Sequence, residues 1–188
     1  KKTSKDIFVS IANNHSLDFG EKGYANTKKF LKKNKLLYAS GKREVCKDKI
    51  CFINVSDHCG CYTKDEWKWK KNIWIINHKN ISLLSKKVKN IYDSKKYKLI
   101  VVSIHWGSNY LDNIPGFMFK TGKILIDNGA NIIFGHSAHH IPPKSTKLYK
   151  SKIINNNGLI IYGLGDFIND YAINEKYKSD EALMCIID

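Results

Sequence analysis

Four short apolar runs that each end in a turn and a polar side chain constrain the fold of this chain most strongly. They span residues 6–12, 98–104, 130–134 and 158–164. Each run is continuously apolar and rich in β-branched residues, which is typical of strands buried on both faces. Such strands occur in sheets that other elements cover on both sides, so the runs predict the interior of a layered fold.

Segments with helical spacing separate these runs. The expected helices cover residues 21–34, 79–93 and 117–128. Residues 43–55 instead predict a β-hairpin, and residues 181–188 predict a closing strand. The alternation of strands and helices predicts one α/β domain over residues 1–188, which is long enough to bury about two-thirds of its unfolded surface.

Polar side chains with metal-binding or acid–base chemistry gather at or just beyond the carboxyl ends of these runs. They are Asn14, His15, His105, His136 and Asp166. Because loops at the carboxyl ends of strands in an α/β sheet converge on one crevice, we expect these side chains to meet in space. Neutral imidazoles, carboxylates and amide oxygens are ligands for Zn, Mn or Fe. The sequence therefore predicts a metal site or an acid–base site in that crevice.

Three histidines lie close together after the third run. Gly135 permits a sharp turn there, and the spacing of His136 and His139 predicts that both imidazoles lie on one side. His140 adjoins His139 and is expected to point elsewhere, so at most one of these two neighbours is a direct ligand.

A carboxylate follows the histidine of the first run. Asp18 lies three residues after His15 and could orient its imidazole through the second ring nitrogen, as in a general acid or base held by a carboxylate. His58 and His78 lack comparable company, and we interpret them as structural histidines.

The charge of the chain restricts its partners. The net charge is +15, from 32 basic and 17 acidic residues, and Arg43 is the only arginine. Nucleic-acid surfaces usually use arginine for bidentate contacts, so this composition argues against a nucleic-acid partner. An anionic polymer or another acidic substrate would still be attracted by such a field. No apolar run approaches the roughly 20 residues of a membrane helix.

The five cysteines leave two readings open. Cys46 and Cys51 flank the turn of the predicted hairpin, where they either face each other or are simply buried. Cys59 and Cys61 lack a partner pair at the usual zinc spacing, so a structural zinc site is not favoured.

The motifs at these strand ends resemble those of the bacterial capsule-synthesis and poly-γ-glutamate synthesis (CapA-like) family, which is related to the calcineurin-like metallophosphoesterases. The matching segments are SIANNHSLDFGEKGYANT (10–27), VVSIHWGSNY (101–110), LIDNGANIIFGHSAHHIPP (125–143) and IIYGLGDFI (160–168). They occur in the order typical of the family, and the similarity covers nearly the whole chain.

The resemblance implies a four-layered α/β/β/α sandwich with two divalent metal ions, Mn, Fe or Zn, between its sheets. The implied metal ligands are Asn14, His105, His136 and His139. His15, assisted by Asp18, would contact the scissile group and protonate the leaving oxygen. Residues beside these motifs would contact the substrate or support the ligands; they are Trp106, Gly107, Tyr110, Asp166 and His140.

The chain departs from the family pattern at several positions. Ser137 stands where a second histidine is usual, Asn109 where a glutamate is usual, and Asp166 where an amide is usual. The opening strand of the family, which ends in a Gly-Asp motif with a metal-bridging aspartate, would precede Lys1, so we expect the N-terminal strand to be missing from this sequence. The resemblance also implies an extracytoplasmic, membrane-associated setting, through a segment outside this chain.

These observations lead to two principal hypotheses of function. The first is a metal-dependent hydrolase or related transferase that acts on a phosphate ester or an anionic polymer. The second is a non-catalytic component of anionic-polymer synthesis or export that binds the polymer through its lysine-rich surface. A nucleic-acid-binding module ranks last.

Overall fold

The computed structural model describes residues 7–58, 71–168 and 172–187. Its order along the chain is β1 (Phe8–Val9), α1 (Gly20–Lys33), β2 (Leu37–Tyr38), β3 (Val45–Lys47), β4 (Ile50–Ser56), α3 (Ile81–Asp93), β5 (Leu99–His105), α4 (Gly116–Asp127), β6 (Ile132–His136), β7 (Thr146–Lys150) and β8 (Asn157–Ile161). A mixed six-stranded sheet has the order β3-β4-β5-β6-β8-β7, and β1 pairs with β2 in a separate two-stranded sheet.

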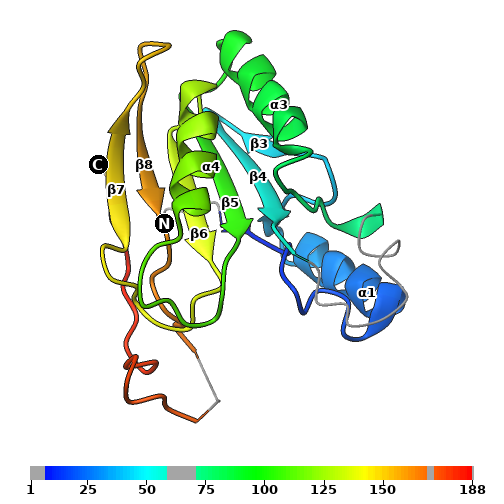
Figure 1. Ribbon diagram of the computed structural model, residues 1–188. Coiled ribbons are helices and arrows are strands. Elements are labelled where there is room, and N and C mark those ends of the chain that lie inside the picture. The colour runs from blue at the N-terminus through cyan, green and yellow to red at the C-terminus, as the bar shows by residue number, and fades with distance from the viewer. Residues whose placement is uncertain (1–6, 59–70, 169–171, 188) are drawn as a thin grey trace, which may run out of the picture.

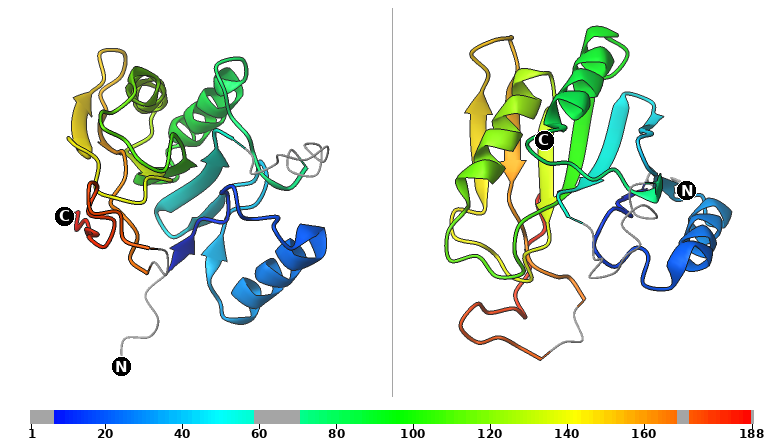
Figure 2. Two further views of the ribbon diagram at one scale, coloured as in Figure 1. Left: turned by 60° about the horizontal axis from the view of Figure 1, so that its bottom comes forward. Right: turned by 45° about the vertical axis from the view of Figure 1, so that its right-hand side comes forward.

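The elements stack in four layers, which confirms the predicted α/β/β/α arrangement. Helices α3 and α4 cover one face of the six-stranded sheet, and the β1–β2 pair with α1 lies on its other side (Figures 1 and 2). The phenyl rings of Phe8 on β1 and Phe52 on β4 lie 5.7 Å apart, so the two sheets are in contact there. The second sheet has only two residues per strand among the described residues and covers only part of the larger one.

Alternation along the parallel strands separates the two faces of the large sheet. On the helix-covered face, Val55, Ile104 and Ile133 are fully buried in the main hydrophobic core. Along each strand, the residues before and after these positions point to the opposite face, because successive side chains of a strand alternate. On that face the carboxyl halves of β4 and β5 carry polar side chains; they are Asn54, Ser56, Ser103 and His105. The strands therefore hold an apolar core with one face and a polar surface with the other.

The helices and the hairpin fall close to their predicted positions, whereas two strand predictions need correction. The run 6–12 contributes only Phe8–Val9 to a strand, because β2 pairs with just those two residues. The predicted closing strand at 181–188 is wrong over its described part, since residues 181–187 enter no strand. The segment is instead irregular, and the Leu183 amide donates to the Leu164 carbonyl. Strand β7 was not predicted because its lysines obscure the alternation expected of an edge strand.

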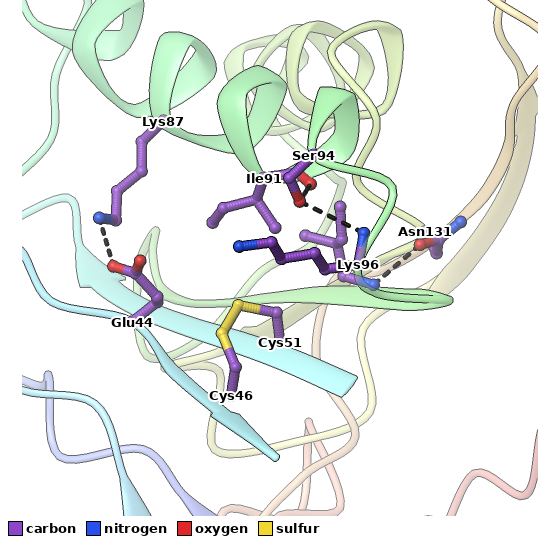
Figure 3. Close-up of a disulfide and its surroundings, with 9 residues drawn as sticks. Glu44, Cys46, Cys51, Lys87, Ile91, Ser94, Lys96 and Asn131 are labelled. Carbon is purple, nitrogen blue, oxygen red and sulfur yellow. Dashed lines mark hydrogen bonds and ion pairs between the residues drawn. A yellow bond between two sulfur atoms is a disulfide. The ribbon is translucent and has the colours of Figure 1, made fainter. Parts of the chain in front are cut away.

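A disulfide closes the hairpin and settles the first cysteine question. Cys46 and Cys51 face each other across β3 and β4, with Cα atoms 4.1 Å apart, and their sulfurs are bonded (Figure 3). Lys87 of α3 forms an ion pair with Glu44 beside this hairpin. Cys59 and Cys61 lie outside the described residues. The disulfide lies near the amino end of β4, at the other end of the strand from the polar residues.

Among the described residues, no helix has the length and apolar character required to span a bilayer.

Candidate functional site

The parallel pairing of β4, β5 and β6 aligns three strand ends at one edge of the sheet. Ser56, His105 and His136 are direct neighbours in the register of these strands. Because these three residues are paired in register, their side chains lie on the same face of the sheet, opposite the helices. The predicted convergence of polar strand ends is therefore seen for His105 and His136.

These two histidines form a close pair with unusual electrostatics. Their Nδ1 atoms lie 3.3 Å apart, so one nitrogen donates and the other accepts. Burial and the neighbouring imidazole of His136 lower the pKa of His105 to about 3, and burial lowers the pKa of His136 to about 4. Both rings are consequently neutral at physiological pH. The Nε2 atom of His105 is buried without a hydrogen-bond partner among the described residues.

Two hydroxyl groups contact the other side of His136. Its Nε2 atom lies 3.0 Å from Ser103 Oγ and 3.3 Å from Ser10 Oγ. Ser10 follows β1, so this contact joins the smaller sheet layer to the polar face of the larger sheet. The first apolar run therefore reaches the same site as β5 and β6.

A third imidazole, that of His58, lies beside the histidine pair, although the sequence analysis set it aside. His58, His105 and His136 together form a histidine row. The ring centroids of His58 and His105 are 4.9 Å apart. Asp57 accepts a hydrogen bond from His58 Nδ1, and this bond raises the pKa of His58. The expectation that His58 lacks comparable neighbours was wrong, whereas its hydrogen bond to Asp57 agrees with the structural role predicted for it. Its signal was available, since Ile50–Ser56 is itself an apolar run and Asp57 and His58 directly follow it.

The same carboxylate fixes the start of the loop after β5. Asp57 Oδ2 accepts a 2.8 Å hydrogen bond from the Gly107 amide, and Gly107 has a φ of +76°, which favours glycine. Ser137 Oγ donates to the Gly107 carbonyl. The predicted site residue Gly107 therefore ties the ends of β4, β5 and β6 together through its backbone.

The predicted pairing of His15 and Asp18 is present. His15 Nδ1 lies 2.8 Å from Asp18 Oδ2, and the two side chains are 63% and 49% exposed. The Asn13 side chain accepts the His15 amide proton at 2.8 Å, which folds residues 13–15 into an Asx turn. His15 lines a pocket of about 500 Å³ together with Ser10, the residue that contacts His136. Asn14 is half-buried within the same turn.

His139 and His136 have different partners despite their short spacing. His139 Nδ1 lies 2.6 Å from Asp166 Oδ2, and its amide donates to the Asn109 carbonyl. Between the two histidines, Ser137 has a φ of +134°, which redirects the backbone. His136 and His139 were expected to act together. His136 instead belongs to the histidine row, whereas His139 pairs with the carboxylate of Asp166.

The remaining predicted residues occupy supporting positions. His140 is buried, and its Nε2 accepts a 2.9 Å hydrogen bond from the Leu111 amide, so this nitrogen is already used. Burial lowers the pKa of His140. Trp106 lies on the helix-covered side, where its indole N–H donates to the Tyr162 carbonyl. Tyr110 stacks on Tyr177 with ring centroids 4.8 Å apart.

The residues present fit a divalent ion in part. His105 and His136 offer neutral imidazoles, which is the form that binds metal. Among the described residues, however, no three His, Cys, Asp or Glu side chains gather closely enough to hold an ion. Within the pair, His105 Nε2 is the ring nitrogen without a partner among the described residues, whereas both ring nitrogens of His136 are engaged, so His136 would exchange a present contact for an ion. The predicted amide ligand Asn14 is outside these four residue types.

The chain is similar to proteins of capsule synthesis over most of its length. The profile of the family described as "Bacterial capsule synthesis protein PGA_cap" matches residues 2–171. "Capsule biosynthesis protein CapA" of Bacillus anthracis is 32% identical over 86% of this chain and 40% of its own length. "PGA biosynthesis protein CapA" of Bacillus subtilis is 28% identical over 90% of the chain and 45% of its own length. A "Probable polyglutamine synthesis accessory protein" of Mycobacterium tuberculosis is 25% identical over 93% and 49%, respectively. The chain thus spans less than half the length of these relatives.

Proposed function

The chain belongs to the bacterial capsule synthesis protein family PGA_cap, and from this premise we propose that it is a metal-assisted hydrolase or group-transfer enzyme. Its substrate class would be an anionic polymer or a phosphate ester. The observation that carries the proposal is the pair of neutral imidazoles, buried His105 and half-buried His136, at the joint end of three parallel strands.

In this proposal the pair holds a divalent ion. His105 and His136 would supply nitrogen ligands, and Asn14 and His139 would complete the set that the motifs imply. Mn, Fe and Zn all accept this combination of imidazole and amide ligands. When bound, such an ion polarises a phosphoryl or carbonyl oxygen of the substrate and stabilises the charge that develops on it.

Proton transfer would fall to His15. Its contact with Asp18 fixes a proton on Nδ1 and leaves Nε2 to exchange a proton with the leaving oxygen. Both side chains are exposed, so a bulky substrate can reach them. Ser10 lines the same pocket as His15 and contacts His136, which supports a joint role of the proton-transfer pair and the imidazole pair.

The charge of the chain supports an anionic substrate. A net charge of +15 raises the local concentration of polyanions and accelerates their encounter with the protein. The names of the Bacillus relatives concern capsule and PGA biosynthesis, which agrees with this chemistry. We therefore propose poly-γ-glutamate and phosphodiesters as the first substrates to test.

Metal binding provides the direct test, because its readout does not depend on activity. Titration calorimetry with Mn²⁺ and Zn²⁺, supported by elemental analysis, should detect an ion in the unaltered chain. His105→Ala and His136→Ala should each weaken its affinity by at least about 100-fold, since they remove a direct ligand. His78→Ala, an exposed histidine that contacts neither residue of the pair, is the matched control. Undiminished affinity in both alanine variants would contradict the proposal.

The strong positive charge also favours a second candidate, a non-catalytic polymer-binding component. It predicts that poly-γ-glutamate binds with an affinity that falls steeply as salt increases. His105→Ala would leave that binding unchanged, and no hydrolysis would occur with any metal. Hydrolysis that is lost in His15→Ala, with binding retained, would reject this candidate in favour of the enzyme.

A further inference from the structure

A separate pocket of about 490 Å³ opens on the helix-covered side of the large sheet. Its walls are mainly apolar and come from α3, α4 and the segment before α3; they include Ile76, Ile81, Phe117 and Ile124. The histidine row lies on the opposite face of the same strands, so this pocket is distinct from the site described above. Its volume lies within the range typical of small-molecule sites, about 300–1,000 Å³.

One cation is available at the wall of this pocket. Lys120 of α4 is exposed, and it forms no ion pair with any residue that the structure describes. The pocket also contains the carboxylate of Asp57, but both of its oxygens are engaged, one by His58 and the other by the Gly107 amide. Of these two charged side chains, Lys120 is therefore the one that is left to pair with a ligand, and the group it pairs with is an anion.

We propose that this pocket binds an amphipathic anion, a ligand with an apolar chain or ring and a single anionic head group. The apolar body would replace water along Ile76, Ile81 and Phe117, where each Å² of apolar surface removed from water contributes about 25 cal/mol. The head group would lie at Lys120. A neutral or cationic molecule with the same chain would gain the burial without the ion pair, so the pocket selects by charge. This assignment is independent of the proposed enzymatic function.

The position of Asp57 connects the pocket to the histidine row. Asp57 lines the pocket, and it also holds His58, whose ring lies against His105. A ligand that displaces water beside this carboxylate changes the environment of His58 through one shared side chain. Occupancy of the pocket should therefore be detectable on the far face of the sheet.

Charge selectivity is tested by calorimetric titration with octanoate, octyl phosphate, 1-octanol and octylammonium. We expect both anions to bind, and 1-octanol and octylammonium to bind at least 10-fold more weakly. Lys120→Met should weaken anion binding about 10-fold or more and leave 1-octanol binding unchanged. Lys123→Met, on the same helix but outside the pocket, should change neither. Equal affinity for octanoate and octylammonium, or an undiminished affinity in Lys120→Met, would overturn the proposal.

The location of the ligand is tested by filling the pocket. Ile124 is 38% exposed, so the larger side chain of Ile124→Trp can enter the pocket without disrupting the core. Octanoate binding should be lost, while the urea midpoint of unfolding remains that of the unaltered chain. A second apolar groove, on the other face of the sheet beside Phe134, is a competing location for the alkyl chain. If Phe134→Ser rather than Ile124→Trp abolishes binding, the assignment to this pocket is wrong.

The connection to the histidine row has its own readout. Long-range ¹H–¹⁵N spectra resolve the ring nitrogens of individual histidines. Octanoate should shift the His58 signals and leave those of His15 in place, because His15 lies in the other pocket. In Lys120→Met, the same octanoate concentration should produce a smaller His58 shift. Binding without any His58 shift would reject the connection through Asp57.

Discussion

The two faces of β4, β5 and β6 differ sharply although their residues are neighbours in the sequence. On the helix-covered face, Val55, Ile104 and Gly135 pair in register; all three are buried, and Val55 and Ile104 belong to the main core. One residue further along each strand, Ser56, His105 and His136 pair on the opposite face and form a polar surface. Residues that stabilise the core thus alternate with residues of the candidate site along the same three strands.

The polar face lowers the stability of the folded chain where its buried polar atoms lack hydrogen-bond partners. His105 is buried with one ring nitrogen lacking a partner, and Asn54 Oδ1 is in the same state among the described residues. Unsatisfied buried polar atoms typically cost about 1–3 kcal/mol each. The helix-covered face offsets this cost by apolar burial. A ligand that satisfied these atoms would stabilise the folded chain, whereas one on the helix-covered face would have no such atoms to satisfy.

The largest expected effect comes from truncating Ile104 on the helix-covered face, compared with truncating its neighbour His105 on the polar face. Ile104→Ala removes a fully buried side chain and should lower the free energy of unfolding by about 2–5 kcal/mol. His105→Ala should cost less than half as much, because it also removes the unsatisfied ring nitrogen. Urea unfolding of metal-free protein measures both values. Equal losses of stability would show that His105 is a packing residue like its neighbour.

Gly135 tests how closely the core approaches β6. A Cβ atom at this position would lie 2.2 Å from Trp106 Nε1 and 2.6 Å from the Ile161 carbonyl oxygen, and the latter belongs to the backbone. Gly135→Ala should therefore destabilise the chain by about 1–3 kcal/mol or more. Gly116→Ala is the control, because a Cβ there meets no atom within 4 Å. A loss of stability in the control as large as in Gly135→Ala would contradict the steric explanation.

How far the sequence predicts this arrangement depends on the range of the interactions involved. The apolar runs and their polar ends predict the strands and the convergence of His105 with His136, because register follows from the parallel order of strands. The separation of His136 from His139 could not be predicted, since it depends on the backbone turn at Ser137 and on the contact with Asp166.

His58 shows a different kind of failure. It was missed although its local signal is the same as that of His105, because the segment before it was interpreted only as half of a hairpin. Its role in the row also depends on β4 pairing with β5, a contact between residues about fifty positions apart.

The pH dependence of stability should distinguish the buried pair from His58. The pKa values of about 3 for His105 and about 4 for His136 lie below the value near 6.5 of an unfolded chain. Protons therefore bind the unfolded state preferentially, and the stabilisation is lost as the pH falls below about 6.5. At pH 5 each neutral imidazole accounts for a loss on the order of 2 kcal/mol.

Unfolding experiments between pH 5 and pH 8 in EDTA test this expectation. His105→Gln should show a shallower fall of stability below pH 6.5 than the unaltered chain. His58→Gln should act in the opposite direction, because the raised pKa of His58 stabilises the fold at low pH and that contribution is lost as the pH rises through the folded pKa. Parallel pH profiles for all three proteins would contradict the assigned charge states.

The smallest expected effect concerns the hydroxyls that satisfy His136. Because its Nδ1 already faces His105, its Nε2 depends on Ser103 and Ser10. Ser103→Ala or Ser10→Ala leaves one hydroxyl in place, so each should cost only about 0.5–1 kcal/mol. The double variant leaves Nε2 unsatisfied in a part-buried position and should cost more than the sum of the two. Urea unfolding in a double-mutant cycle measures this excess, and strict additivity would mean that the two hydroxyls do not share His136 as a partner. An excess would show that the polar face is stabilised by its contact with the smaller sheet layer, whereas the apolar face is stabilised by the helices.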